Sequence, residues 1–326
     1  MGGKAGVFTA SIMLALTVGL CFSGLAKGAN GSMKPFPGYE APSNDNQAEA
    51  PQAQQPSEGP ILKTAGLLVS SSVKQGNVLK VYLSDPDTLA KAQEGLSVQF
   101  AGRRAEFFTQ KDGGMLALVP VSVFQKPGTY SLSLLGADGE QLKPFKISVV
   151  DAHFKTQNVN VSKSTEGLQP LPGEIEAIQA LKNRVSAVKF WDGEFISPTS
   201  DCQNSPFGVL RMHNGVPTGD YHKGVDLRSP AGRPIHAINA GVVEISRMYR
   251  LHGGTVGLDH GQGVGSIYIH MSKLNVTPGE RVKKGDVIGY VGSTGFATGP
   301  HLHWGMYVSG LPVNPNQWIP NVPRCI

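Results

Sequence analysis

The sequence predicts a mainly β protein, with an N-terminal small β-sandwich and a C-terminal antiparallel β-sheet or barrel joined by a short connecting helix. Short runs of alternating or β-branched residues recur along most of the chain, which is typical of brief strands. The 41 glycines and 23 prolines indicate many turns between these runs. One segment between the two β-rich regions has helical spacing instead.

Chain length and composition limit the classes of protein. At 326 residues the chain is long enough for two domains and a tail. With 40% hydrophobic and 16% charged residues, it is not a fully disordered chain, a coiled coil or a polytopic membrane protein. The net charge of +5 suits contact with an anionic surface such as a cell wall or membrane. We expect no nucleic-acid partner, because the sequence has no dense block of Lys and Arg.

Residues 1–26 have the pattern of an export signal. A basic start is followed by a largely apolar run, and the small residues before and at Ala26 suit a signal peptidase. The alternative is an uncleaved membrane anchor, because the run is almost long enough to span a bilayer. Both interpretations predict export, to the periplasm, the cell envelope or the medium, and the second adds a membrane tether. Residues 27–62 are rich in Pro, Gln and Ala, and this composition predicts a disordered tether.

Residues 63–153 are predicted to form the β-sandwich. Turn signals separate several alternating runs, at 78–83, 116–119 and 130–134. The region has one histidine and no clustered acidic residues, so we expect it to bind or to act as a spacer. Residues 154–200 are predicted to be a connector, with one short helix over 173–182 indicated by the apolar positions 175, 178 and 181.

Residues 201–326 are predicted to form the second β-domain. This region is dense in glycine and contains several β-branched runs. Two segments, which begin at Gly232 and Gly279, are near-repeats of each other. A pair of similar hairpins predicts a compact antiparallel sheet or barrel built by duplication.

The cysteines fit an exported protein. Cys21 would leave with a cleaved signal, so Cys202 and Cys325 remain in an oxidising compartment. Sequence alone leaves two alternatives open, a disulfide between them or two unpaired thiols.

Histidines are concentrated in the second β-domain, which holds eight of the nine in the chain. Any single histidine is more often a packing or hydrogen-bonding residue than a metal ligand. We therefore expect structural roles for four of the eight, with His260 as a turn residue between two strands: His213, His236, His252 and His260.

Spacing suggests that other histidines gather at one site. His301 and His303 point to the same face of a strand, about 7 Å apart, so one is expected to bind a metal and the other to lie near its water. His222 and Asp226 flank Gly224, which would let the chain fold back so that both side chains face the ion. Two imidazoles and one carboxylate leave a fourth position open on tetrahedral zinc, which is the arrangement of a hydrolytic site.

Residues 205–319 resemble the M23 family of zinc metallopeptidases, of the lysostaphin/LytM type. The similarity covers about a third of the chain and follows the family's motifs in order, at residues 222–227, 230–235, 268–270, 293–295 and 299–304. The resemblance implies one Zn²⁺ per chain, with His222, Asp226 and His303 as its ligands. It further implies His270 and His301 as the catalytic pair that polarises the water and stabilises the tetrahedral intermediate.

The resemblance implies hydrolysis of peptide bonds in peptidoglycan, in stem peptides or cross-links, by a metal-activated water. The predicted sandwich resembles a β-domain that precedes this peptidase domain in Gram-negative relatives. One alternative is a non-catalytic LytM-type regulator that activates a cell-wall amidase, although all five site positions are filled here. A biotinyl or lipoyl carrier is a weaker alternative, because the lysines of residues 281–286 lack the usual context of a modified lysine. The bond that is cleaved stays open.

Overall fold

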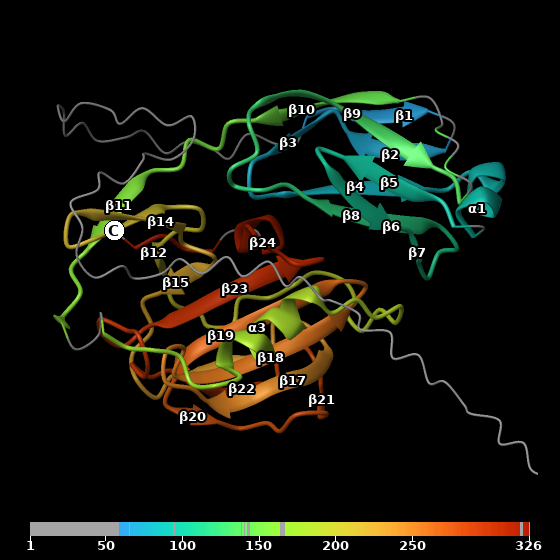
Figure 1. The fold of residues 1–326 in the computed structure, drawn as a ribbon. Coiled ribbons are helices and arrows are strands. Elements are labelled where there is room, and N and C mark those ends of the chain that lie inside the picture. The colour runs from blue at the N-terminus through green and yellow to red at the C-terminus, as the bar shows by residue number, and fades with distance from the viewer. Residues whose placement is uncertain are drawn as a thin grey trace, which may run out of the picture. The chain divides into compact units, whose positions relative to one another are not determined.

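The computed structural model describes residues 59–64, 66–93, 95–137, 139, 141, 144–163, 167–319 and 322–325 (Figure 1). The predicted signal or anchor, residues 1–26, and the predicted tether up to residue 58 lie outside these ranges. No helix within the described ranges is long and apolar enough to cross a bilayer. The mainly β class is confirmed, since strands are far more numerous than helices.

The first part of the described chain is a sandwich of two five-stranded sheets, drawn in blue to green in Figure 1. The buried apolar side chains of both sheets form one core between them. The first sheet has the order β1-β2-β4-β8-β7. Its strands are β1 (Ile61–Thr64), β2 (Leu67–Ser70), β4 (Val78–Leu83), β8 (Met115–Pro120) and β7 (Phe108–Thr109).

The second sheet of the sandwich has the order β3-β10-β9-β5-β6. Its strands are β3 (Ser72–Lys74), β10 (Phe145–Val150), β9 (Gly128–Leu135), β5 (Ser97–Phe100) and β6 (Arg103–Glu106). The three predicted runs became β4, β8 and β9, while β1 begins two residues before the predicted boundary at residue 63. Helix α1 (Pro86–Gln93) was not expected from the sequence. It begins after Asp85, whose carboxylate accepts the Thr88 N–H at 3.0 Å.

The predicted connector holds both a strand and a helix. Strand β11 (Thr156–Val159) pairs in parallel with β13 (Leu210–His213), which pairs with β14 (Val216–Tyr221). Helix α3 (Glu174–Asn183) confirms the expected helix within one residue. It lies against β17 (Gly241–Met248) and β18 (Gly254–Gly261) (Figure 1). Ile178 and Leu181 are buried there, but Ile175 is 48% exposed. Only two of the three apolar positions that predicted the helix therefore face the core.

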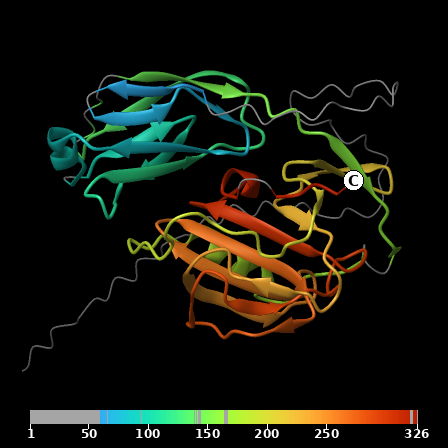
Figure 2. The same cartoon turned by 180° about the vertical axis from the view of Figure 1, so that it is seen from behind.

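An eight-stranded antiparallel sheet, drawn mainly in orange and red in Figure 2, dominates the C-terminal part. Its order is β12-β15-β23-β19-β18-β17-β21, with β24 beside β23. Its central strands β18 and β19 are buried along their whole length. The strands are β12 (Gln203–Ser205), β15 (Val225–Leu227), β17 (Gly241–Met248), β18 (Gly254–Gly261), β19 (Val264–Met271), β21 (Arg281–Val282), β23 (Leu302–Val308) and β24 (Leu311–Val313), and η1 (Pro315–Gln317) follows β24.

The near-repeats pair with each other and do not form two separate hairpins. A smaller sheet contains β16 (Pro234–His236), β22 (Val287–Tyr290) and β20 (Lys273–Leu274). β16 of the first repeat pairs with β22 of the second, and β21 of the second pairs with β17 of the first. The predicted compact antiparallel arrangement is thus present, but each repeat supplies the strands that pair with those of the other.

A disulfide joins Cys202 to Cys325, which answers the question that the sequence left open. Backbone hydrogen bonds reinforce it, since the Cys325 N–H donates to the Gln203 carbonyl at 3.0 Å and the Gln203 N–H donates to the Pro323 carbonyl at 2.6 Å. The bond ties the last described residues to the strand that precedes the predicted metal ligands. It closes a loop with a sequence separation of 123 residues.

The double variant Cys202→Ser/Cys325→Ser should lower the free energy of unfolding by about 2–5 kcal/mol, because the unfolded chain regains the entropy that the cross-link removes. Denaturant unfolding followed by fluorescence measures the difference. Wild-type protein unfolded with a reductant is the control and should match the variant. Equal unfolding midpoints for oxidised wild type and variant would contradict a stabilising disulfide.

Candidate metal centre and active site

Strand pairing brings two predicted ligands together. β15 runs antiparallel to β23 with Asp226 directly opposite His303. Val225 and Leu227 on either side of Asp226 are buried, as are Leu302 and Trp304 on either side of His303. Because side chains alternate along a strand, these apolar neighbours enter the core on one face while Asp226 and His303 share the other.

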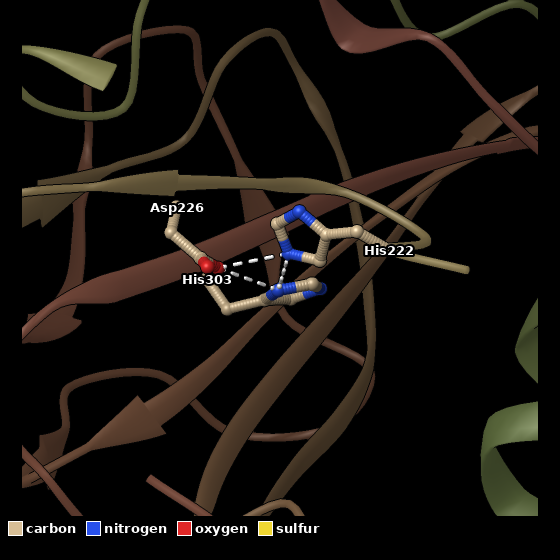
Figure 3. Close-up of side chains that lie close together, drawn as sticks. All are labelled: His222, Asp226 and His303. Atoms are coloured by element: carbon tan, nitrogen blue, oxygen red, sulfur yellow. Dashed lines mark hydrogen bonds and ion pairs between the residues drawn. The ribbon is translucent and has the colours of Figure 1, made fainter. Parts of the chain in front are cut away.

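His222 reaches the same point from the end of β14. Its Nε2 lies 3.0 Å from Asp226 Oδ1 and 3.0 Å from His303 Nδ1, and the last two atoms are also 3.0 Å apart (Figure 3). The three donor atoms therefore form a nearly equilateral triangle. Ligands of a tetrahedral zinc ion with bonds of 2.0–2.1 Å would lie about 3.3 Å apart, which is close to this spacing.

The proton positions favour a cation at this triangle. His222 Nδ1 lies 2.8 Å from the Pro206 carbonyl oxygen, which only accepts hydrogen bonds, so this nitrogen carries the proton. The opposite nitrogen, Nε2, then presents a lone pair to the Asp226 carboxylate, which is also an acceptor. Two acceptors 3.0 Å apart repel unless a proton or a metal ion lies between them, so the donor set can share a proton when metal-free and also fits a divalent metal ion.

Glycine is required at position 224 because the backbone there passes very close to β23, and not because the turn needs a left-handed residue. Its φ is not in the left-handed region. A Cβ at this position would lie 2.4 Å from the Trp304 carbonyl oxygen and 2.8 Å from His303 Nε2. His222 and Asp226 both face the site, as expected of a chain that folds back at Gly224, and glycine permits this because it lets the chain pass directly over β23.

His270 enters the site through a β-bulge. Between Gly254 and Val256 of β18 the register with β19 shifts, so β19 carries one extra residue there. His270 lies in this bulge with φ of 64°, a left-handed conformation that is uncommon for residues other than glycine. The irregular backbone turns this side chain toward His301, whose ring centroid is 4.9 Å away.

Backbone carbonyls orient both of these imidazoles. His270 Nδ1 donates to the Thr294 carbonyl and His301 Nδ1 to the Gly299 carbonyl, each at 2.8 Å. In the neutral form of each ring, the lone pair is therefore on Nε2. His301 Nε2 lies 3.9 Å from Asp226 Oδ1. All five residues expected at the site are thus gathered in one place.

Burial and charge set the ionisation of the metal-free site. Burial lowers the pKa of His270 to about 3 and that of His303 to about 4. Burial alone would raise the pKa of Asp226, but the adjacent His222 and His303 imidazoles hold it well below its ordinary value. At neutral pH Asp226 is therefore an anion beside neutral His303, the state in which both bind a metal.

The other four histidines have the structural roles expected of them. His213 stacks on Phe296 at 5.6 Å, and His236 Nδ1 donates to the Gly285 carbonyl at 2.8 Å. His252 Nδ1 donates to Glu174 at 2.7 Å. His260 is fully buried and bonded to Ala240 and Ser266, but it lies within β18, so its expected place in a turn was wrong.

The residues that surround the predicted ligands were not expected from the sequence. Arg211 Nη2 lies 3.5 Å from Asp226 Oδ2, and its other amino group donates to Gln157 at 2.6 Å. Ser205 accepts a hydrogen bond from Arg211 at 3.2 Å and lies 3.3 Å from His222 Nδ1. No spacing or motif distinguishes these residues from other polar ones, because only strand pairing brings β11, β12 and β13 beside the ligands.

Together, the fold and the site combine an antiparallel sheet, a His–Asp–His donor set that could hold a metal ion, and two further imidazoles beside it. The model of peptidase family M23 matches residues 220–315, which contain all five site residues. This chain therefore carries a peptidase family M23 domain.

Known proteins resemble the chain over different lengths. Mpg of Neisseria meningitidis, named a DD-carboxypeptidase/endopeptidase, is 42% identical over 112 residues, covering 34% of this chain and 26% of Mpg. The peptidoglycan DD-endopeptidase ShyA of Vibrio cholerae is 28% identical over 284 residues, covering 76% of this chain and 65% of ShyA. A crystal structure of a Pseudomonas aeruginosa protein assigned to peptidase M23 has a TM-score of 0.55 at 27% identity, covering 75% of this chain and 93% of that one. The chain thus matches only about a quarter of Mpg and just under two thirds of ShyA.

Gly224→Ala should weaken metal binding strongly, because the new methyl group would displace His303 or the Trp304 backbone. Isothermal titration of the metal-free protein with Zn²⁺ measures the effect. Gly265→Ala is a matched control, since its methyl group would make ordinary contacts at 3.4 Å or more. Equal Zn²⁺ affinity in the Gly224 variant and wild type would show that metal binding does not need the close approach of residue 224 to β23.

Without metal, the protein should lose stability as the pH falls from about 6.5 to about 4. Burial lowers the pKa of His260 to about 4, as it does for His303, so the unfolded chain takes up protons that the folded chain refuses. Stability therefore rises with pH across this window, by about 3 kcal/mol at most for fully buried His260. Thermal unfolding in a chelator at several pH values tests this, and a constant midpoint between pH 4.5 and 6.5 would contradict it.

Proposed function

We propose that the chain is a zinc metalloendopeptidase that hydrolyses peptide bonds in peptidoglycan. The observation that carries this proposal is the triangle of donor atoms from His222, Asp226 and His303, 3.0 Å apart, beside two further imidazoles in an M23 domain. The names of the relatives Mpg and ShyA support peptide cross-links with D,D stereochemistry as the bond attacked.

Zinc is the proposed metal, one ion per chain. Two imidazoles and one carboxylate match the ligand types of catalytic zinc sites. When bound, zinc would lower the pKa of a water molecule and polarise a carbonyl group. Side chains of Asp226, His301 and His303 keep 15%, 16% and 13% of their surface exposed, so water and substrate have access.

His301 and His270 are proposed to move protons during hydrolysis. Both present an unprotonated Nε2, and either can accept the proton of the attacking water and later deliver it to the leaving amine. The Asp226 carboxylate lies 3.9 Å from His301 Nε2, so this ring borders the proposed metal centre. A protonated imidazole would also donate to the developing oxyanion.

Export is proposed from the pattern of residues 1–26, and peptidoglycan as partner from the mild positive charge. The chain would act in the periplasm or cell envelope, or after secretion, with the N-terminal segment as a signal or tether. A non-catalytic regulator of amidases is not favoured, because such a role needs no complete set of metal donors.

His303→Ala should abolish both stoichiometric zinc and peptidoglycan hydrolysis, because it removes a ligand. His301→Ala should keep one zinc per chain and lose turnover, because it removes a proton carrier but no ligand. Elemental analysis and digestion of defined cross-linked muropeptides, with products identified by mass, give the two readouts.

The control is His153→Asn, at an exposed histidine outside the cluster, which should behave as wild type. Normal digestion by the His301 variant would refute the role given to that residue. Zinc-loaded wild type that leaves every muropeptide intact would refute the enzymatic function.

A further inference from the structure

Helix α3 inserts a fully buried carboxylate into the loop beside the catalytic pair. Glu174, the first residue of α3, is 0% exposed. Its Oε1 accepts the N–H groups of Leu251 at 3.0 Å and His252 at 2.8 Å, together with His252 Nδ1 at 2.7 Å. Its Oε2 accepts the N–H groups of Leu171 at 2.8 Å and Arg250 at 3.2 Å. These five hydrogen bonds offset the cost of burying the charged carboxylate.

Glu174 is therefore ionised, and it fixes a loop that would otherwise have free backbone donors. Burial alone would raise the pKa of Glu174, but the donors from Leu171 and His252 hold it below its ordinary value. Three consecutive N–H groups, at 250, 251 and 252, end on this one carboxylate. Glu174 thus holds this loop through three successive backbone hydrogen bonds.

The same loop holds the bulged backbone of His270. In the bulge, the His270 N–H donates to the His252 carbonyl at 3.0 Å rather than to a neighbouring strand. The next loop is tied to the first, since the Phe296 N–H donates to the Leu251 carbonyl at 2.7 Å and the Gly254 N–H to Thr294 Oγ1 at 2.9 Å. Thr294 in turn supplies the carbonyl that orients the His270 ring.

We propose that Glu174 is a positioning residue for His270, acting through the 250–253 loop and Thr294. This inference rests on the proposed function, in which His270 takes part in hydrolysis. It assigns part of the catalytic apparatus to the connector helix, which lies outside the 220–315 segment matched by the M23 model. A left-handed residue keeps its strained conformation only where its surroundings impose it, and Glu174 supplies that constraint.

Glu174→Gln in the full chain tests the proposal. Glutamine turns an NH₂ group toward two of the donors, so the loop should loosen and His270 lose its orientation. We expect kcat to fall about 10- to 100-fold with KM little changed, while one zinc per chain is retained. The imidazole NMR signal of the His270 Nδ1 proton, assigned with His270→Ala, should weaken or shift. Glu176→Gln, at an exposed carboxylate on the same helix, should match wild type in every readout.

Thr294→Val provides a second variant in case Glu174→Gln fails to fold. It removes the hydroxyl that accepts from Gly254 and donates to the Met271 carbonyl at 2.8 Å, and a smaller loss of the same kind is expected. Wild-type kcat and an unchanged His270 signal in the folded variants would overturn the proposal. A fall in kcat that is fully explained by lost zinc would overturn it as well. If wild type hydrolyses no peptidoglycan, the proposed function fails, and the NMR signal alone still decides whether Glu174 orients His270.

Discussion

The pairing of β15 with β23 is the contact on which the site depends. It places Asp226 opposite His303 although 77 positions separate them in the chain. The neighbours of both residues are large apolar side chains buried in the core, so a slip by one residue would expose them to water and turn both ligands inward. Burial of Val225, Leu227 and Trp304 thus holds the donor atoms in register.

Backbone carbonyls determine the chemistry of the imidazoles. The carbonyl oxygens of Pro206, Thr294 and Gly299 each accept a hydrogen bond from the Nδ1–H of a site histidine. In the neutral rings this leaves the Nε2 lone pair to bind a metal or a proton. Such partners fix the tautomer before anything binds, and this reduces the reorganisation that binding requires. The carbonyls come from loops, and the loops are held by the sheet and by α3.

Much of the site could be predicted because its signals are local. His222 and Asp226 lie four residues apart, and His301 and His303 alternate on one strand, so short-range geometry already brought each pair together. The surrounding shell could not be predicted. Arg211, Ser205 and Glu174 are single polar residues on separate elements, and nothing in their local sequence records which side chain they meet. Helix α1 was missed because eight residues are too few for a clear periodic signal.

By itself, the sequence determined the mainly β class, the short connecting helix and the residue types of a metal centre, since alternation, glycine content and histidine spacing are properties of neighbouring positions. Only the tertiary structure decided that the two near-repeats pair with each other, that Cys202 meets Cys325, and that Gly224 is needed for close approach to β23. These outcomes depend on contacts between residues far apart in the chain. Their free energy comes from burying apolar surface in the whole sheet, which no local pattern can report.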